Sequence, residues 1–438
     1  MGGPGAGRGA APPVGRLSTG ASRGAELFDR ARGVLVGGVN SPVRAMRAIG
    51  RDPVFIARAE GACVWDVDGA RYVDFLSTWG PAILGHAPPA VLSALRDALP
   101  LGTSYGAPTE REVRFAEAVI DAFPSVERLR MTSSGSEAVM GALRLARAAT
   151  GREPIVKVAG GYHGAIDGLL AEAGSGLTTL GVPSSPGVTA AATAATRIVP
   201  YNDPAAAAAA LEGAAAMIVE PVAGNMGVVP PDDGYLAALR AACDSTGALL
   251  ILDEVITGFR VARGGAQELY GVPADLTCFG KVIGGGLPVG AFGGRADVMA
   301  ELAPEGPCYQ AGTLSGNPLA TAAGLAVLAE LAREGVYARL DEGGAALEDA
   351  LRASGAPVAV SRVGSMLTPF FADGPPIDYA TATMSDTAAY GAFARALLDA
   401  GVYPPPSQYE AWFVGLAHGE AEMREAREAL ARAAEAVA

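Results

Sequence analysis

Lysine is almost absent from this sequence, so its two lysines are the first candidates for chemistry. Of the 33 basic residues, only Lys157 and Lys281 are lysines. Arginine cannot replace lysine where an amine must lose its proton and attack a carbonyl, because the guanidinium stays protonated at any usable pH. Lys157 lies inside the otherwise apolar run 154–158, which predicts a strand and favours a structural role. Lys281 instead follows the run 276–279 and precedes three glycines, so it is the stronger candidate.

Two carboxylates follow another apolar run in the same manner. Asp253 and Glu254 come directly after residues 248–252, which are all apolar. Ligands of wound α/β sheets bind at the carboxyl ends of the strands. Since Lys281 and this carboxylate pair both follow predicted strands, we expect the two strand ends to converge on one site. A carboxylate at a strand end can also be a buried core group or a helix cap, so position alone leaves its role open.

Two kinds of site combine a lysine with a glycine run: a phosphate-binding loop and a pyridoxal phosphate site. The phosphate loop needs glycine at position 275 and serine or threonine at 282, but the chain has Asp275 and Val282. Pyridoxal phosphate needs a lysine for the Schiff base, an aspartate for the pyridine nitrogen and a helix terminus for the phosphate. Lys281 and Asp253 supply the first two, so the sequence favours pyridoxal phosphate.

The phosphate is expected to bind where a predicted helix begins. The run Ser134-Gly-Ser-Glu137 has the spacing of a capping box, which predicts a helix start with free N–H groups. Gly135 and Ser136 supply those groups. Tyr162 follows two glycines and could stack on the cofactor ring, although ordinary core packing explains a tyrosine there equally well.

The order of the predicted elements places this site in a wound α/β sheet. Between residues 75 and 330, short apolar runs alternate with amphipathic helices, which is typical of a large domain of that fold. Continuous apolar runs predict parallel strands buried on both faces, at 155–158, 216–219, 248–252 and 276–279. Residues 331–438 predict a smaller α+β domain, and residues 24–74 are expected to pack with it. Residues 1–23, rich in glycine, alanine, proline and arginine, predict a disordered tail.

Composition excludes several classes of function. The formal net charge is −13 over 438 residues, which repels nucleic acid and anionic lipid. No apolar stretch reaches the roughly 20 residues that a membrane span requires. The four cysteines and three histidines lack the spacing of a disulfide framework or a metal site, so we expect no metal and a reducing, cytoplasmic location.

Several separated motifs resemble the glutamate-1-semialdehyde 2,1-aminomutase family, within the class III aminotransferases of fold-type I pyridoxal-phosphate enzymes. The resemblance runs from about residue 27 to the C-terminus. The broad class is marked by Asp253-Glu-Val-Ile-Thr-Gly258 and Gly280-Lys-Val-Ile-Gly-Gly-Gly286. The narrower family is marked by the segments Gly38-Val-Asn-Ser-Pro-Val-Arg44, Thr78-Trp-Gly-Pro81, Glu220-Pro-Val-Ala-Gly-Asn-Met-Gly227, Tyr309-Gln-Ala-Gly-Thr-Leu-Ser-Gly316 and Pro406-Ser-Gln-Tyr-Glu-Ala411.

The resemblance assigns roles to individual residues of this chain. It implies that Lys281 is the Schiff-base lysine and proton shuttle, and that Asp253 pairs with the pyridine nitrogen. It implies that Thr313 reaches the phosphate of the neighbouring subunit, and hence a homodimer with shared sites. The other implied cofactor-binding residues are Ser134, Gly135, Ser136, Tyr162, His163, Asn225 and Val255. The implied substrate-binding residues are Ser41, Trp79, Glu410 and Arg44, the last as a clamp for the substrate carboxylate. Independently of the resemblance, Ser175 lies between two glycines and could reach a bound substrate.

The resemblance also implies a reaction. The family moves the amino group of glutamate-1-semialdehyde, an amino-aldehyde, from C4 to C5, through 4,5-diaminovalerate, to give 5-aminolevulinate for tetrapyrrole synthesis. The cofactor alternates between pyridoxamine 5'-phosphate and pyridoxal 5'-phosphate. A glycine-rich lid is predicted over residues 161–186, where the chain departs from the family at Ala165, Ile166 and Glu172. A class III aminotransferase or aminomutase paralogue acting on another amino acid therefore stays open. A catalytically silent relative is disfavoured, because Lys281 and Asp253 are both present.

Overall fold

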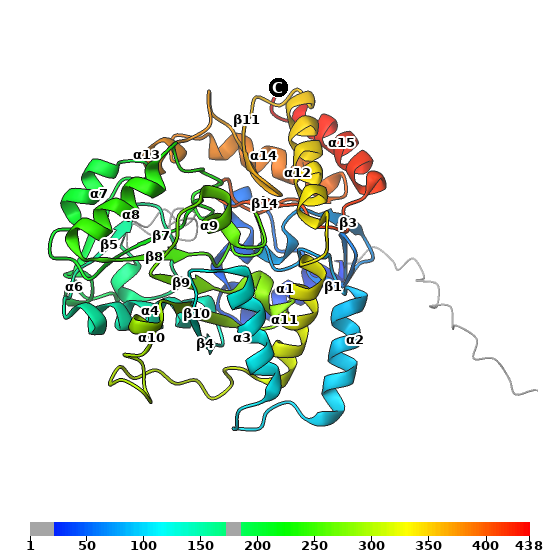
Figure 1. Ribbon diagram of the computed structural model, residues 1–438. Helices are drawn as coiled ribbons and strands as arrows, with labels where there is room; N and C mark the ends of the chain where they lie inside the picture. The colour runs from blue at the N-terminus through cyan, green and yellow to red at the C-terminus, as the bar shows by residue number, and fades with distance from the viewer. Residues whose placement is uncertain (1–21, 172–184) are drawn as a thin grey trace, which may run out of the picture.

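The large sheet has seven strands and lies in the left half of the molecule as Figure 1 shows it. The computed structural model describes residues 22–171 and 185–438. The strand order is β4-β10-β9-β8-β7-β5-β6, and only β10 runs antiparallel to its neighbours. This confirms the predicted α/β fold with a mostly parallel sheet. The strands are β4 (Arg128–Thr132), β5 (Ile155–Val158), β6 (Thr196–Val199), β7 (Ala216–Val219), β8 (Leu249–Asp253), β9 (Leu276–Phe279) and β10 (Gly290–Gly294).

The continuous apolar runs predicted these strands closely. β5, β7 and β9 have the predicted bounds, and β8 begins and ends one residue later than predicted. Asp253 is therefore the last residue of β8 rather than the first residue after it. All residues of these four strands are buried, as expected for strands covered on both faces.

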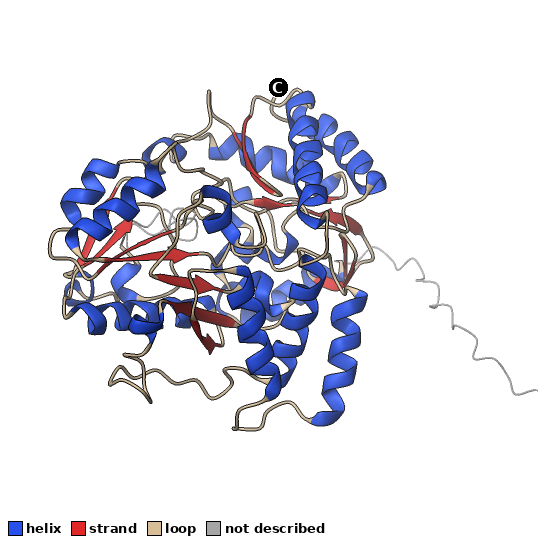
Figure 2. Cartoon of the chain, viewed as in Figure 1, coloured by secondary structure: helices blue, strands red, loops and turns tan. Residues whose placement is uncertain are grey.

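Helices cover both faces of the large sheet (Figure 2). Alternate strand residues such as Val156, Met217 and Leu250 pack against α7 (Pro204–Ala210) and α8 (Tyr235–Thr246). Their neighbours Ile155 and Ile218 pack against α4 (Gly135–Thr150) and α10 (Ala296–Met299) on the opposite face. A further group of helices packs beside the β4 and β10 edge, namely α2 (Pro89–Ala98), α3 (Glu110–Ala122) and α11 (Pro318–Leu331).

Two smaller sheets bring the beginning and the end of the chain together. In one, β3 (Arg71–Asp74) pairs in parallel with β13 (Val402–Tyr403). The same sheet contains β1 (Ile56–Glu60) and β2 (Cys63–Asp66), and the other contains β11 (Ala359–Val363), β12 (Met366–Phe370) and β14 (Trp412–Phe413). The pairing of β3 with β13 supports the expected packing of residues 24–74 with the C-terminal domain. The division of the chain into domains stays a prediction.

Helices near both chain ends share one hydrophobic core with these sheets. Val73, Leu347, Phe393 and Leu430 all belong to it. Residues 1–21 of the predicted tail lie outside the described residues, and α1 begins at Arg23 with Ser22 as its N-cap. The remaining helices are α1 (Arg23–Val34), α6 (Ala190–Thr193), α9 (Gly265–Tyr270), α12 (Val336–Ala353), α13 (Tyr379–Ala382), α14 (Thr387–Asp399) and α15 (Glu420–Ala434). None of the helices in the described ranges is long and apolar enough to span a bilayer.

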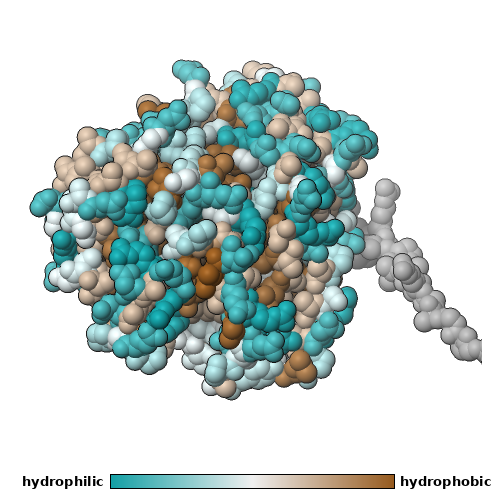
Figure 3. Space-filling view, viewed as in Figure 1, coloured by the Kyte–Doolittle hydropathy of each residue, from teal (hydrophilic) through white to brown (hydrophobic). Residues whose placement is uncertain are grey.

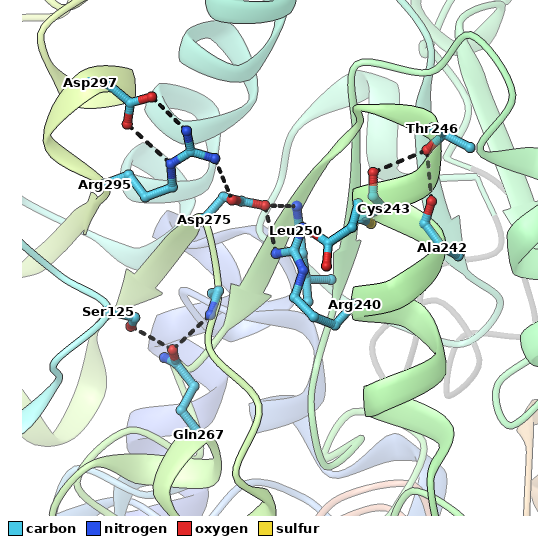
Figure 4. Close-up of polar contacts among 12 residues, drawn as sticks. Ser125, Arg240, Ala242, Cys243, Thr246, Leu250, Gln267, Asp275, Arg295 and Asp297 are labelled. Carbon is cyan, nitrogen blue, oxygen red and sulfur yellow. Dashed lines mark hydrogen bonds and ion pairs between the residues drawn. The ribbon is translucent and has the colours of Figure 1, made fainter.

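A buried carboxylate ties four elements together at the sheet edge where β8 and β9 begin (Figure 4). Asp275 Oδ2 accepts from Arg240 Nη1 of α8 at 2.7 Å and from the backbone N–H of Leu250 in β8 at 2.8 Å. Its Oδ1 accepts from Arg295 Nη1, directly after β10, at 3.0 Å. Because Asp275 immediately precedes β9, one side chain fixes the register of three strands and a helix.

We expect Asp275→Ala to lower the free energy of unfolding by about 2–3 kcal/mol, because it leaves the buried N–H of Leu250 without its acceptor and removes one carboxylate partner from each of Arg240 and Arg295. The matched control is Asp297→Ala, which removes another partner of Arg295 at an exposed position and should cost less than about 1 kcal/mol. Urea unfolding followed by circular dichroism measures both. Equal losses in the two variants would contradict the structural role of Asp275.

Candidate active site

A cavity of about 200 Å³ opens at the edge of the large sheet where the parallel strands end. Each segment that lines it follows one strand of that sheet. Lys281 follows β9 and Asp253 ends β8, so the expected convergence of these two strand ends is confirmed. The lining residues are Gly135, Ser136, Val139, Tyr162, His163, Gly164, Glu220, Asn225, Asp253, Val255, Ile256 and Lys281.

Asp253 is held rigidly by two hydrogen bonds. Its Oδ1 accepts the backbone N–H of Val255 at 3.1 Å, and its Oδ2 lies 2.7 Å from Nδ1 of His163. Both the Asp253 and the His163 side chains are buried. A carboxylate fixed in this way inside a cavity is suited to face a cationic ring nitrogen.

Glu254, the second carboxylate of the pair, points away from the cavity. It accepts hydrogen bonds from the hydroxyl of Thr257 and from the backbone N–H groups of Ala266 and Gln267, both at 3.0 Å. Successive side chains of a strand point to opposite faces, which separates the two carboxylates. Glu254 therefore has the core role that the sequence left open, and it folds the loop between β8 and α9.

Lys281 lies in a backbone conformation that is rare for a residue with a side chain. Its φ is +49°, in the left-handed region, and residues with such strained geometry cluster at functional sites. Desolvation lowers the pKa of its amine, while the nearby carboxylates Glu220, Glu410 and Asp253 act in the opposite direction. A lowered pKa increases the fraction of neutral amine, which is the form that attacks a carbonyl.

The N-terminus of α4 forms the floor for an anion. Gly135 and Ser136 are the first residues of the helix, so their N–H groups have no partner within it, and both residues line the cavity. Ser134 is the N-cap, and its hydroxyl accepts from the N–H of Glu137 at 3.2 Å. The predicted capping box is only half correct, because the Glu137 carboxylate accepts from Ser133 N–H instead of returning to Ser134.

A close backbone approach shapes the same end of the cavity. Gly164 has φ +87°, and a Cβ at that position would lie 2.4 Å from the hydroxyl oxygen of Ser136. Only glycine fits there, because any side chain would fill the space in front of the helix start.

Glu220, which the sequence reasoning did not single out, organises the wall opposite α4. One of its oxygens accepts the N–H of Tyr162 at 3.0 Å, and the other accepts from the Asn225 amide at 2.9 Å. Burial raises the pKa of Glu220 and of the Tyr162 phenol. Tyr162 is 38% exposed and lines the cavity, so core packing does not account for it. The signal for Glu220 was present, since it directly follows the run 216–219 as Asp253 ends β8.

None of the four expected substrate residues that the structure describes lines this cavity. Arg44 is exposed, and its guanidinium carbon lies 5.4 Å from the ring centre of Trp79, which is partly buried. Ser41 is the N-cap of the short 3-10 helix Pro42–Ala45 that contains Arg44. Glu410 is buried, and its charge acts on Lys281 and Tyr162. Ser175, together with residues 172–184 of the predicted lid, lies outside the described residues.

Thr313 lies on a part of the protein surface that is separate from this cavity. It is exposed and lines a separate cavity of about 510 Å³ together with Gly312, Glu112 and residues 104–109 and 315–318. Within a single chain, Thr313 is therefore not brought to the cavity that contains Lys281.

The residues around the cavity fit pyridoxal phosphate. The donor set offers an amine for the aldehyde, a carboxylate for the ring nitrogen, a flat side chain for the ring face and helix N–H groups for the phosphate. The close approach of Gly164 keeps the space before α4 open for such a group.

Comparisons with known proteins agree with this geometry. The family model of class-III aminotransferases matches residues 46–403. The chain is 57% identical to the glutamate-1-semialdehyde 2,1-aminomutase of Pelotomaculum thermopropionicum, covering 94% of this chain and 96% of that protein. Among solved structures, an omega-transaminase from Sphaerobacter thermophilus is similar with a TM-score of 0.87 and 32% identity, covering 95% of this chain and 98% of that one.

A second similar structure belongs to an aminomutase. It is a glutamate-1-semialdehyde aminomutase from Pseudomonas aeruginosa in complex with PMP, with a TM-score of 0.84, 28% identity and 95% coverage of both chains. With the family model matching most of the sequence, the chain belongs to the class-III aminotransferase family.

Proposed function

We propose that this chain is a pyridoxal-phosphate-dependent glutamate-1-semialdehyde 2,1-aminomutase, an isomerase that forms 5-aminolevulinate for tetrapyrrole synthesis. The observation that carries the proposal is the single cavity where the amine of Lys281, the carboxylate of Asp253 and the start of α4 meet. It occurs in a chain that is 57% identical to a protein of that name.

When bound, pyridoxal phosphate takes up the substrate amine and withdraws electrons from the carbon that bears it. The residues of this chain supply the rest. Lys281 Nζ would take the proton that leaves the carbon bearing the amine and would hold it for return. The Asp253 carboxylate would keep the ring nitrogen protonated, and the N–H groups of Gly135 and Ser136 would hold the phosphate. Tyr162 would cover the ring and exclude water.

The substrate carboxylate is assigned to Arg44. The guanidinium is exposed, and no ion pair within the described ranges occupies it. Ser41 is the N-cap of the short helix that contains Arg44, and Trp79 lies against the Arg44 guanidinium. The negative charge of Glu410 disfavours a second carboxylate near Lys281. This arrangement favours a substrate with one carboxylate and an amino-aldehyde end, which needs no separate amine donor.

The deciding experiment is incubation of purified protein with glutamate-1-semialdehyde and no other amine donor. Formation of 5-aminolevulinate is the expected result. The second candidate, a class III transaminase acting on another amino acid, is favoured by the likeness to an omega-transaminase and by Ala165 and Ile166 in the predicted lid. It predicts no 5-aminolevulinate under these conditions and turnover only when an amine donor is added.

The proposal includes a cytoplasmic homodimer. Apolar side chains are exposed in the segment around Thr313, at Tyr309 and Leu314, and also at Leu101. Figure 3 shows apolar residues at the lower edge of the molecule, where α2 ends in Figure 1. These surfaces, and the absence of Thr313 from its own chain's cavity, support a second copy that receives Thr313 at its phosphate site.

Mixing two defective variants tests this sharing. Thr313→Ala should weaken cofactor binding about tenfold through loss of one phosphate contact, and Lys281→Ala should be inactive. In a mixed dimer, one site takes both changes and the other site takes neither. Refolding the variants together at low cofactor concentration should therefore restore about a quarter of the parent activity. If Thr313 served its own chain, or if the active species were a monomer in ultracentrifugation, no activity would return.

A further inference from the structure

Arg260 is a buried arginine with no carboxylate partner in the described part of the chain. It is 1% exposed, and its guanidinium donates only to two backbone carbonyls and one hydroxyl. Burial lowers its pKa to about 9. A buried charge without an opposite charge is costly, and an apolar side chain of similar size usually gives a more stable fold. A guanidinium at this position therefore needs a reason other than stability.

Its hydrogen bonds join three separate segments behind the proposed active site. One terminal nitrogen donates to the carbonyl oxygen of Gly80. The other donates to the carbonyl oxygen of Val414, directly after β14, at 2.9 Å and to the hydroxyl of Ser365 at 3.3 Å. The guanidinium carbon lies 5.2 Å from the ring centre of Phe413, whose face attracts a cation.

The segment that contains Gly80 is a strained turn. Ser77, Thr78, Trp79 and Gly80 have φ values of +45°, +58°, +60° and +113°. Three consecutive residues with side chains in the left-handed region are unfavourable, and such geometry persists only where the surroundings impose it. The turn contains Trp79, whose ring centre lies 5.4 Å from the guanidinium carbon of Arg44.

The same turn contacts the reactive lysine. A Cβ on Gly80 would lie 3.6 Å from Cδ of Lys281 and 3.5 Å from the ring of Phe413. The backbone of Gly80 therefore forms the wall behind the Lys281 side chain. The positive charge of Arg260 is also close enough to act on the Lys281 amine.

The backbone of Arg260 is held in place by the loop that follows β8. Glu254 accepts the hydroxyl of Thr257 and the N–H groups of Ala266 and Gln267, which closes this loop on itself. The preceding residue, Phe259, is also held in the left-handed region, with φ +57°. The direction of Arg260 is thus set by the same segment that begins with Asp253.

From these contacts we infer that Arg260 is a positioning residue, which clamps the strained turn 77–80 to the Phe413–Val414 segment and so holds Trp79 and the wall behind Lys281 in the geometry that binds substrate. The catalytic groups themselves do not touch the guanidinium. Without the clamp, the turn relaxes toward ordinary backbone angles and moves Trp79, while the cofactor contacts around α4 are retained.

Amide hydrogen exchange tests the clamp without substrate or cofactor. Arg260→Met keeps most of the side-chain volume but removes the charge and every donor. We expect exchange in a peptide covering residues 75–82 to become about tenfold faster, since the Trp79 and Gly80 amides lose the support of their turn. The matched control, Ser365→Ala, removes only one partner of Arg260 and should leave that exchange within about threefold of the parent. Unchanged exchange in Arg260→Met would overturn the inference.

Steady-state kinetics test whether Arg260 affects substrate binding, and this second experiment rests on the proposed function. In Arg260→Met we expect KM for glutamate-1-semialdehyde to rise about tenfold while kcat falls less than about threefold and cofactor absorbance is retained. A merely structural arginine would lower the amount of folded enzyme but leave KM unchanged, and that result would overturn the positioning role. A parent protein that fails to turn over this substrate would overturn the proposed function, whereas the exchange measurement would still decide the clamp.

Two further variants keep the inference testable if Arg260→Met folds poorly. Arg260→Lys retains the charge and one donor group, so exchange at residues 75–82 should rise by about threefold, between parent and Arg260→Met. Thr78→Gly removes the cost of the left-handed backbone at an exposed position, so adding it to either Arg260 variant should bring KM back toward the parent. Parent-like exchange in Arg260→Lys, or no recovery of KM in the double variant, would count against the clamp.

Discussion

Lys281→Ala is expected to abolish turnover, with a loss of at least about 10⁴-fold, and to remove the visible absorbance of lysine-bound cofactor. The variant deletes the amine that both holds the cofactor and moves the proton, and the neighbouring residues of the cavity offer no other amine. Free cofactor should still bind through α4 and Tyr162, so the variant should retain cofactor that gel filtration can remove.

The only other lysine provides the matched control. Lys157 is buried in β5, and its amine donates to the carbonyl oxygens of Gly161, Leu169 and Ala171 at 3.1, 2.9 and 2.9 Å. Lys157→Met should therefore lower stability by about 2–4 kcal/mol, because three carbonyls lose their donor, yet keep the lysine-bound absorbance. Borohydride reduction and peptide mapping that placed the cofactor on Lys157 would overturn the assignment of Lys281.

The strands that carry the site were predictable because their signal is local. β5, β7 and β9 are four-residue runs buried on both faces, and in such strands nearly every residue must be apolar. The first polar residue after each run therefore marks the strand end, and in a parallel sheet these ends meet along one edge. This argument led to Asp253 and Lys281, and it would have led to Glu220 if applied to β7.

Other features depend on contacts between distant segments, which a local pattern does not contain. The local sequence does not predict that Arg260 is buried. Its partners Gly80, Ser365 and Val414 come from remote parts of the chain. The left-handed turn 77–80 has glycine only at its last position, so its conformation is imposed from outside.

The burial of individual helix residues was harder to predict than the helices themselves. In α4, helical spacing predicts that Met140 is buried together with Val139 and Leu143, but Met140 is 39% exposed while the other two are buried. Helical periodicity identifies the apolar positions of a helix, and it does not say which of them the chain's own sheet covers. The prediction for Met140 was wrong for this reason.

Asp253→Asn should retain the cofactor and lose about 10³-fold in turnover rate. The amide has nearly the same shape, and its oxygen can still accept the N–H of Val255, so the fold of the segment after β8 is preserved. It cannot hold a proton on the pyridine nitrogen by charge, and the cofactor then withdraws electrons poorly. In the parent, His163 Nδ1 lies 2.7 Å from an oxygen of the Asp253 carboxylate. In Asp253→Asn the amide NH₂ faces this nitrogen, so the imidazole of His163 must accept a hydrogen bond there.

A variant of the neighbouring Glu254 distinguishes this electronic effect of Asp253→Asn from a general loss of structure. Glu254→Gln changes a buried carboxylate that does not line the cavity and that accepts three hydrogen bonds in the loop. It should lower stability by about 1–3 kcal/mol, while the folded fraction keeps its rate and spectrum. Asp253→Asn should show the reverse, with a thermal midpoint near that of the parent and a large loss of rate. Near-normal turnover in Asp253→Asn would show that the cofactor ring does not depend on this carboxylate, and the ring nitrogen would then need a different proton partner.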